Sequence, residues 1–144
     1  MGSGPHIRLI IARTAKAIEK VDRASIANTG LNVSDFSILE ALLHKGPLPI
    51  NTIGEKVLLT SGSMTAAANR LIEKDLVKRS QDPSDGRFFI LHLTLSGRKL
   101  IKQAYEKHSR NLEKIAGALT IKERTQLVKL LKKIGRHAQS LDIE

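Results

Sequence analysis

The sequence contains no cysteine among its 144 residues. This absence excludes disulfide bonds and zinc sites built from thiolates. It also excludes regulation by thiol oxidation, because that switch requires a thiol. The five histidines never occur three or four residues apart, which is the spacing that places two metal ligands on one helical face. We therefore expect no metal site and no cofactor, although metal ligands that are distant in the sequence would leave no such pattern.

Aromatic residues are also scarce, at 3% of the chain, which argues against base stacking on single-stranded nucleic acid. The longest uncharged run, residues 57–69, is too short and too rich in Ser, Thr and Gly to span a bilayer. Near the N-terminus, Arg8 and Arg13 interrupt the only short apolar run, so no signal peptide is expected. These features predict a cytoplasmic protein with no membrane partner.

The motifs of several enzyme classes are missing as well. The sequence has no phosphate-binding glycine loop, no dinucleotide-binding fingerprint and no serine elbow. Ser96 and Lys99 match the Ser-x-x-Lys pattern of penicillin-recognising enzymes, but the accompanying Ser-Asp-Asn and Lys-Thr-Gly elements are absent. The simpler interpretation is that Thr94 caps a helix and that these residues form its first exposed turns. We do not expect an enzyme.

What the chain does have is positive charge and a sufficient apolar content. Its formal net charge is +10 and its pI is near 10.2, which indicates a polyanionic partner. Its length and its 41% of hydrophobic residues are sufficient for one domain with its own core. The middle of the chain supplies the expected core residues, which are Phe36, Ile38, Leu39, Leu42, Leu43, Ile53, Val57, Leu71, Leu76 and Leu93.

Residues 60–71 have the apolar spacing of a helix with one buried face. The side chains of the opposite face are mostly short, which allows the helix to lie deep in the major groove of DNA. Asn69 and Arg70 on this face carry the forked donors that read adenine and guanine edges. Thr60 or Ser61 is the expected cap, which leaves first-turn N–H groups able to meet a phosphate. The alternative is a surface helix of small residues that only packs. The apolar face consists of Met64, Ala67, Ala68 and Leu71, and the outer face includes Gly62, Thr65, Ala66, Asn69, Arg70 and Glu73.

A β-hairpin is expected directly after this helix. Residues 77–81 and 88–93 are rich in strand-forming side chains, and the Pro, Ser, Asp and Gly between them favour a turn. Arg87 lies at the tip, where an extended arginine suits the negative potential of a narrow minor groove. Asp85 is placed to pair with an arginine and hold it in position. The alternative is a solvated turn whose charges only favour solubility.

This part of the sequence resembles the MarR family of bacterial transcription regulators. The resemblance rests on the Ser/Thr-rich helix and on the residues Leu71, Leu76, Val77, Arg79, Asp82, Asp85, Arg87, Leu93, Thr94 and Gly97 at their mutual spacing. It implies winged-helix homodimers that bind pseudopalindromic operators and are commonly released by small ligands or oxidation. Two positions depart from the family pattern: Asp75 replaces a glycine that ends the helix, and Gly54 replaces an alanine.

The expected fold is mainly α with a small β-hairpin wing, a winged helix-turn-helix with dimerisation helices at both ends. We expect a single domain over 5–144, with the winged helix-turn-helix over about 32–95 and the dimerisation helices over about 6–29 and 95–141. Within it, a helix over 34–45 should be opened by Ser34 and Asp35, and another should begin near Ile50.

Apolar stripes near the two ends of the chain either complete a monomeric core or pack across a two-fold axis, and the self-contained core of the middle favours the dimer. The first stripe comprises Ile7, Ile10, Ile11, Ile18 and Val21. The second comprises Leu127, Leu130, Leu131, Ile134, Ala138 and Leu141.

The predicted function is that of a sequence-specific regulator, a repressor that binds double-stranded DNA as a homodimer. An architectural or RNA-binding module that recognises only charge and shape is the alternative. The expected DNA contacts are Ser61, Ser63, Thr65, Ala66, Asn69, Arg70, Lys74, Arg79, Asp85 and Arg87. Arg13, Phe36, Tyr105 and His108 are the candidates for a small-molecule effector site implied by the resemblance, and core packing is the alternative for Phe36 and His108.

Overall fold

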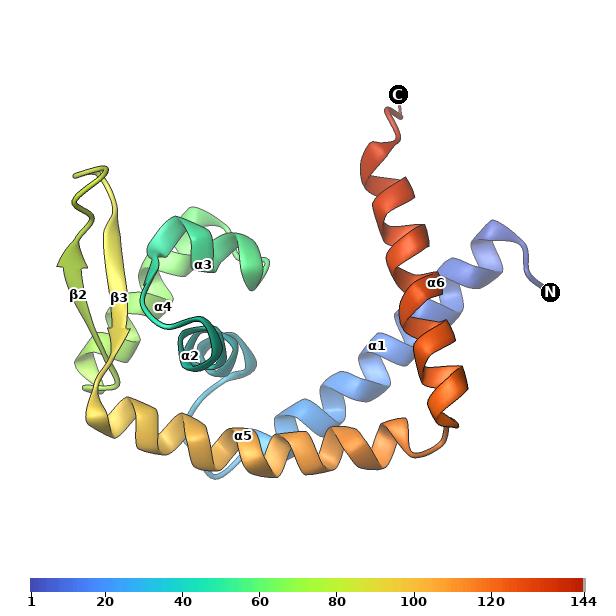
Figure 1. Ribbon diagram of the computed structural model, residues 1–144, viewed down its shortest axis with the longest axis horizontal. Helices are drawn as coiled ribbons and strands as arrows, with labels where there is room; N and C mark the ends of the chain where they lie inside the picture. Colours follow the sequence, from blue (N-terminus) through green and yellow to red (C-terminus); the bar gives the residue numbers. More distant parts are fainter. Residues whose placement is uncertain (144) are drawn as a thin grey trace. The chain divides into compact units, whose positions relative to one another are not determined.

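The computed structural model describes residues 1–143, in which the chain forms six helices and a three-stranded sheet (Figure 1). The mainly α fold with a small β-hairpin is therefore confirmed. The elements in order are α1 (Gly4–Ile26), α2 (Val33–Lys45), β1 (Leu48–Pro49), α3 (Ile50–Lys56), α4 (Ser61–Glu73), β2 (Val77–Gln81), β3 (Phe89–Leu93), α5 (Leu95–Ala116) and α6 (Ile121–Ser140).

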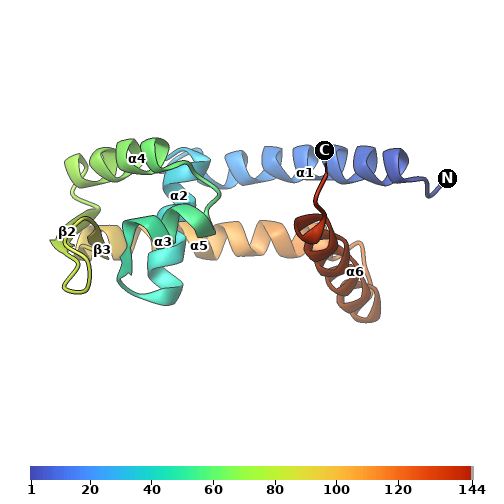
Figure 2. The same ribbon diagram turned by 90° about the horizontal axis from the view of Figure 1, so that it is seen from above.

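The contacts divide the chain into two compact units, and each is described by itself. The first is Met1–Ser109, and the second begins at Arg110, so the division falls within α5. The first unit contains the helix-turn-helix and the hairpin, which lies beside α3 and α4 in both views (Figures 1 and 2). No helix of the described chain is long and apolar enough to cross a membrane.

Local side-chain caps set the ends of the first two helices. Ser3 caps α1, and this helix ends at Ile26, three residues before the expected end, where Thr29 Oγ1 donates a 2.6 Å hydrogen bond to the Ile26 carbonyl. Asn32 caps α2 by accepting a bond from the Asp35 amide, so the expectation that Ser34 and Asp35 open this helix is wrong by two residues. Gly46 closes α2 with a φ of 76°, a conformation that favours glycine.

The sheet has the strand order β1-β3-β2, and both pairings are antiparallel. The hairpin register pairs Val77 with Leu93 and Gln81 with Phe89, close to the expected strands. The two-residue strand β1 was not predicted from the sequence, because Leu48–Pro49 is too short to show an alternating pattern.

The core of the first unit lies between α2, α3, α4, β3 and the first part of α5. The most buried side chains are Ile38, Leu39, Leu42, Ile53, Met64, Leu71, Leu91 and Ile101. Among the residues expected in the core, Leu43, Val57 and Leu93 are only half-buried and pack around it. The core of the middle of the chain is therefore confirmed.

The second unit consists mainly of α6, which begins with a capping box. Thr120 accepts from the Glu123 amide, and the Glu123 carboxylate accepts from the Thr120 amide. The hydrogen bonds that Thr120 makes to this carboxylate, the backbone one first, lower the pKa of Glu123. Arg124 forms a 2.9 Å ion pair with Glu113 and donates to the Ala116 carbonyl. No residue of α6 is buried within the described chain, and Leu127, Leu130, Leu131 and Ile134 are all more than 40% exposed.

Candidate nucleic-acid interface

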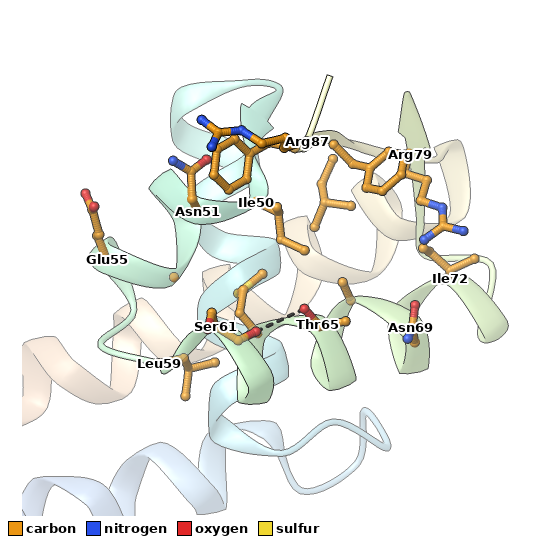
Figure 3. Close-up of a pocket in the computed structure, with 16 residues that line it drawn as sticks. Ile50, Asn51, Glu55, Leu59, Ser61, Thr65, Asn69, Ile72, Arg79 and Arg87 are labelled. Atoms are coloured by element: carbon orange, nitrogen blue, oxygen red, sulfur yellow. Dashed lines mark hydrogen bonds between the residues drawn. The ribbon is translucent and has the colours of Figure 1, made fainter. Parts of the chain in front are cut away.

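Helix α4 presents the thin polar face that the sequence predicts. Thr60 is its cap and accepts a 3.2 Å hydrogen bond from the Ser63 amide. Thr65 Oγ1 donates to the Ser61 carbonyl at 3.0 Å, which holds the short hydroxyl side chain against the helix (Figure 3). The buried face is Met64, Ala67, Ala68 and Leu71, and the exposed residues are Ser61, Gly62, Ser63, Thr65, Ala66, Asn69 and Arg70.

The Arg70 side chain is exposed, but its guanidinium forms an ion pair with a carboxylate of another helix. Its Nη2 lies 2.9 Å from Oδ1 of Asp35, a carboxylate on α2 that is only 2% exposed. The hydrogen bond to Asp35 and the charge of that carboxylate raise the pKa of Arg70. The sequence interpretation grouped Arg70 with Asn69 as a base reader, whereas the structure engages the Arg70 guanidinium with α2. Lys74 is similarly engaged, because its Nζ donates to the Gly30 carbonyl at 3.0 Å.

The tip of the wing, residues 82–88 between β2 and β3, is organised by two aspartates. Oδ1 of the buried Asp82 accepts from both the amide and the hydroxyl of Ser84, at 2.9 and 2.7 Å, and these bonds lower the pKa of Asp82. Arg87 Nε and Nη2 reach the two oxygens of Asp85 at 3.0 and 2.9 Å, and this pairing lowers the pKa of Asp85. The expected pairing of Asp85 with an arginine is thus present, and the Arg87 side chain remains 82% exposed.

A groove of about 440 Å³ lies between α3, α4 and the wing (Figure 3). Arg79 borders it with its guanidinium carbon 4.8 Å from the centre of the Phe89 ring. Sequence reasoning missed Asn51, Phe88 and Phe89 as residues of this site, because it assigned the two phenylalanines only a strand-forming role. The groove is lined by Ile50, Asn51, Gly54, Glu55, Leu59, Ser61, Met64, Thr65, Ala68, Asn69, Ile72, Arg79, Arg87, Phe88, Phe89 and Leu91.

The four candidate effector residues fall at three places in the first unit. Phe36 and His108 are both buried, and their rings meet edge to face with centroids 5.0 Å apart. Tyr105 instead packs on His44, with centroids 4.6 Å apart. Arg13 lies on an exposed stretch of α1 beside Lys16, Lys20 and Arg23. Only two of the four are therefore in contact with each other.

The two ring nitrogens of His108 differ in their contacts. Its Nε2 is 3.6 Å from Oδ1 of Asp22, and its buried Nδ1 has no hydrogen-bond partner among the described residues. No group of three or more His, Asp or Glu side chains in the described chain has the geometry to hold a metal ion.

A thin helix preceded by a helix-turn and followed by a hairpin with an arginine at its tip defines a winged helix-turn-helix. The family model of the MarR family matches residues 31–88, which cover α2 through the wing tip. The HTH-type transcriptional regulator MhqR of Bacillus subtilis is 30% identical over 131 residues, 91% of this chain and 90% of that protein. YkoM, another HTH-type transcriptional regulator of Bacillus subtilis, is 35% identical over 130 residues, 88% of this chain and 84% of that protein. The chain belongs to the MarR family of DNA-binding transcription regulators, which are not enzymes.

Solved structures have the same fold. AbsC, a MarR family transcriptional regulator from Streptomyces coelicolor, superposes with a TM-score of 0.86 at 17% identity, covering 98% of this chain and 97% of that one. Reduced AbfR bound to DNA superposes with a TM-score of 0.74 at 21% identity, and 94% of each chain is covered. BpsR of Bordetella bronchiseptica, whose DNA binding is regulated by 6-hydroxynicotinic acid, superposes with a TM-score of 0.80 at 22% identity. The match covers 90% of this chain and 98% of that one.

Proposed function

We propose that this protein is a homodimeric repressor that binds a pseudopalindromic operator in double-stranded DNA. One observation carries the proposal. The helix α4, whose exposed face has short side chains, and the wing residue Arg87, which is paired with Asp85, belong to the same compact unit. Such a unit fits a helix in the major groove and a basic tip in the adjacent minor groove. A cytoplasmic location follows from this role.

The proposed contacts differ in what they read. Asn69 offers donors and acceptors to base edges, and Arg87, oriented by Asp85, reads the width and potential of the minor groove. Arg79 and Lys74 serve the phosphate backbone. Around Asn69, the first turns of α4 contribute Ser61, Ser63, Thr65 and Ala66.

Arg70 has a different role in this proposal. Its guanidinium is engaged by the buried Asp35, so Arg70 would contact a base only after leaving that carboxylate. Separating the pair would leave Asp35 buried without its counter-charge, which is unfavourable. We therefore propose that Arg70 fixes α4 against α2 and supports the residues that read DNA.

Exposed apolar side chains support the homodimer. In the first unit, Ile7, Ile10 and Ile11 on α1 are between 36% and 46% exposed. In the second unit, the stripe of α6 from Leu127 to Leu141 is exposed throughout. Large apolar stripes of this kind need a partner. We propose one functional domain over 5–144, in which the winged helix-turn-helix spans about 32–95 and the segments 6–29 and 95–141 build the dimer.

We further propose that a small molecule releases the protein from DNA. The contact between Phe36 and His108 joins α2 to α5, so a ligand inserted there would move the DNA-binding helices relative to α5 and shift the population between two arrangements. Tyr105 and Arg13 remain candidates at two other places of the first unit. The regulation of BpsR by 6-hydroxynicotinic acid is consistent with this proposal.

Selection of bound duplexes from a random pool, with and without a library of small organic acids, tests the proposal directly. We expect one palindromic sequence whose half-sites are centred about 10 bp apart and which is held about a thousandfold or more above random DNA. Asn69→Ala should reduce that preference by roughly 1 to 3 kcal/mol for each base edge that Asn69 reads with well-formed hydrogen bonds. Equal affinity for selected and random duplexes would instead assign an architectural role. When the operator overlaps the promoter of a reporter gene, the protein should repress that gene.

A further inference from the structure

The position of the groove between α4 and the wing has a consequence for DNA binding. A recognition helix in the major groove and a wing in the adjacent minor groove have one sugar–phosphate strand between them. In this protein the space between those two elements is the groove of about 440 Å³ (Figure 3). We propose that the groove seats this single strand, that Arg79 is its phosphate anchor, and that Phe89 positions Arg79. The inference rests on the proposed function in DNA binding.

The three arginines of the DNA-binding surface differ in how their charge is balanced. Arg70 is paired with Asp35, and Arg87 is paired with Asp85 through two hydrogen bonds. Arg79 forms no ion pair with a carboxylate among the described residues, and its guanidinium lies over the Phe89 ring. An aromatic face orients a guanidinium without neutralising it, so the N–H donors at its edge remain available to a phosphate. Arg79 therefore offers the least compensated charge of the three.

The other residues of the groove suit a sugar–phosphate strand. The partly exposed Phe88 and Ile50 provide apolar surface that fits the C–H groups of deoxyribose. Figure 3 places Arg79 beside Asn69 and Ile72 at one end, while Glu55, the single carboxylate of the lining, lies at the opposite end. A phosphate is therefore favoured at the Arg79 end, where Asn69 provides a further donor.

The salt dependence of DNA binding distinguishes contacts that neutralise phosphate charge from contacts that fit the shape of the duplex. Each phosphate neutralised by a cation contributes about 0.9 to the slope of log affinity against log salt concentration. Arg79→Ala should therefore flatten the slope by about 0.9 per copy, or roughly 1.8 for a homodimer. Arg87→Ala also removes one positive charge and leaves the Asp85 carboxylate without its partner, so it should flatten the slope by a similar amount or more.

Two substitutions test the positioning role of Phe89. Arg79→Lys keeps the charge and should keep most of the wild-type slope. Phe89→Leu also keeps the charge, so the slope should remain unchanged while affinity falls about two- to fivefold because the aromatic face under Arg79 is gone. If Phe89 acts through Arg79, Phe89→Leu should have little further effect in an Arg79→Ala background. A purely structural role for Phe89 would instead give additive losses.

The complete measurement is affinity for the selected operator and for random duplexes at several salt concentrations, using the full chain. The control is Lys107→Ala, which removes one exposed cation from α5 outside the groove and should leave affinity and slope almost unchanged. Thermal unfolding of each variant confirms that it is folded.

The outcomes separate the two proposals. A wild-type protein that binds no duplex overturns both. A wild-type protein that binds, together with an Arg79→Ala variant of unchanged affinity and slope, overturns the groove assignment alone. If Arg79→Ala leaves DNA binding unchanged but abolishes binding of small aromatic carboxylic acids, the groove is a small-anion site and the proposal for the strand is wrong.

Discussion

Two glycines of the DNA-binding unit differ in their tolerance of a side chain. A Cβ on Gly54 would lie 3.5 Å from the Leu59 carbonyl oxygen and from Met64 Cγ, which is ordinary contact. A Cβ on Gly97 would lie 1.9 Å from the carbonyl oxygen of Leu76, a backbone atom that cannot move aside easily. A methyl group therefore fits at Gly54, whereas glycine is required at position 97, where α5 passes the backbone of Leu76 just before β2.

We predict opposite effects of alanine at these two positions. Gly54→Ala should raise the free energy of unfolding by up to about 1 kcal/mol, because glycine is unfavourable inside a helix. Gly97→Ala should lower it by about 3 kcal/mol or more, because the backbones must separate. Urea unfolding of both variants beside the wild type measures the difference. A wild-type midpoint for Gly97→Ala would contradict the close approach of α5 to Leu76.

The ion pair between Arg70 and Asp35 makes a second prediction at the residue scale. Arg70→Ala leaves a buried carboxylate without its partner, whereas Asp35→Ala lets the half-exposed Arg70 turn to solvent. Arg70→Ala should therefore destabilise the protein more than Asp35→Ala does. The double variant should be less destabilised than the sum of the two single variants. Thermal unfolding at neutral pH checks both statements, and additive losses would show that the pair does not couple α2 to α4.

The wing is the element whose order depends most directly on aspartate charge. Asp82 and Asp85 both have a lowered pKa, the first through hydrogen bonds from Ser84 and the second through Arg87. A carboxylate whose pKa is lower in the folded state stabilises the fold above its unfolded pKa. That contribution is lost as the pH falls through the folded pKa. The wing tip should therefore loosen below roughly pH 4, the ordinary aspartate range, and not at neutral pH.

Hydrogen exchange of two backbone amides measures this loss. The amide of Ser84 donates to Asp82 and that of Arg87 donates to Asp85, at 2.9 and 3.1 Å. We expect their protection factors to fall as the pH is lowered from about 4 to about 2, because a lowered pKa places protonation of both carboxylates below the ordinary aspartate value, while the β2–β3 ladder stays protected. Asp85→Ala is the control, since it removes the acceptor of the Arg87 amide and should therefore remove most protection of that amide already at neutral pH. Protection that stays unchanged down to about pH 2, which is well below the ordinary aspartate value, would refute the role of the two aspartates.

Local patterns in the sequence were sufficient to predict most elements. The apolar spacing of α4, the turn residues of the hairpin and the pairing of Asp85 with Arg87 all involve residues close together in the chain. Even Asp75, the departure from the family glycine, adopts the left-handed φ of 58° that a glycine would favour. These features were predictable because each depends on neighbours within a few residues.

Features that depend on residues far apart in the chain escaped prediction. Arg70 and Asp35 are 35 positions apart, so nothing in the local pattern of α4 showed that Arg70 faces α2. The groove combines residues of α3, α4 and both strands of the wing, and its aromatic residues resembled ordinary strand residues in the sequence. The two-residue strand β1 exists only because β3 pairs with it. The contacts of the site therefore required the tertiary structure.

At the scale of the whole molecule, the exposed face of α6 bears on assembly. Leu130 and Leu131 are 55% and 46% exposed, while Lys129 on the same helix faces away from the apolar stripe. Full burial of a leucine side chain contributes about 1.5 to 3 kcal/mol, and a symmetric interface uses each residue twice. We therefore expect the stripe to contribute a large share of the free energy of dimerisation.

Replacing both leucines with glutamine should raise the dimer dissociation constant at least about tenfold, since a loss of about 1.4 kcal/mol corresponds to a factor of ten. Lys129→Gln, a change on the opposite face of the same helix, should leave association unchanged.

Deleting residues 120–144 should give a monomer or an aggregate, because it removes the stripe and exposes its partner surfaces. Analytical ultracentrifugation measures association, and binding to full and half operators measures its consequence. A monomer should hold both operators with similar, weak affinity, because only one recognition helix is engaged. A stable monomer that binds the full operator as tightly as the wild type would contradict the dimeric architecture.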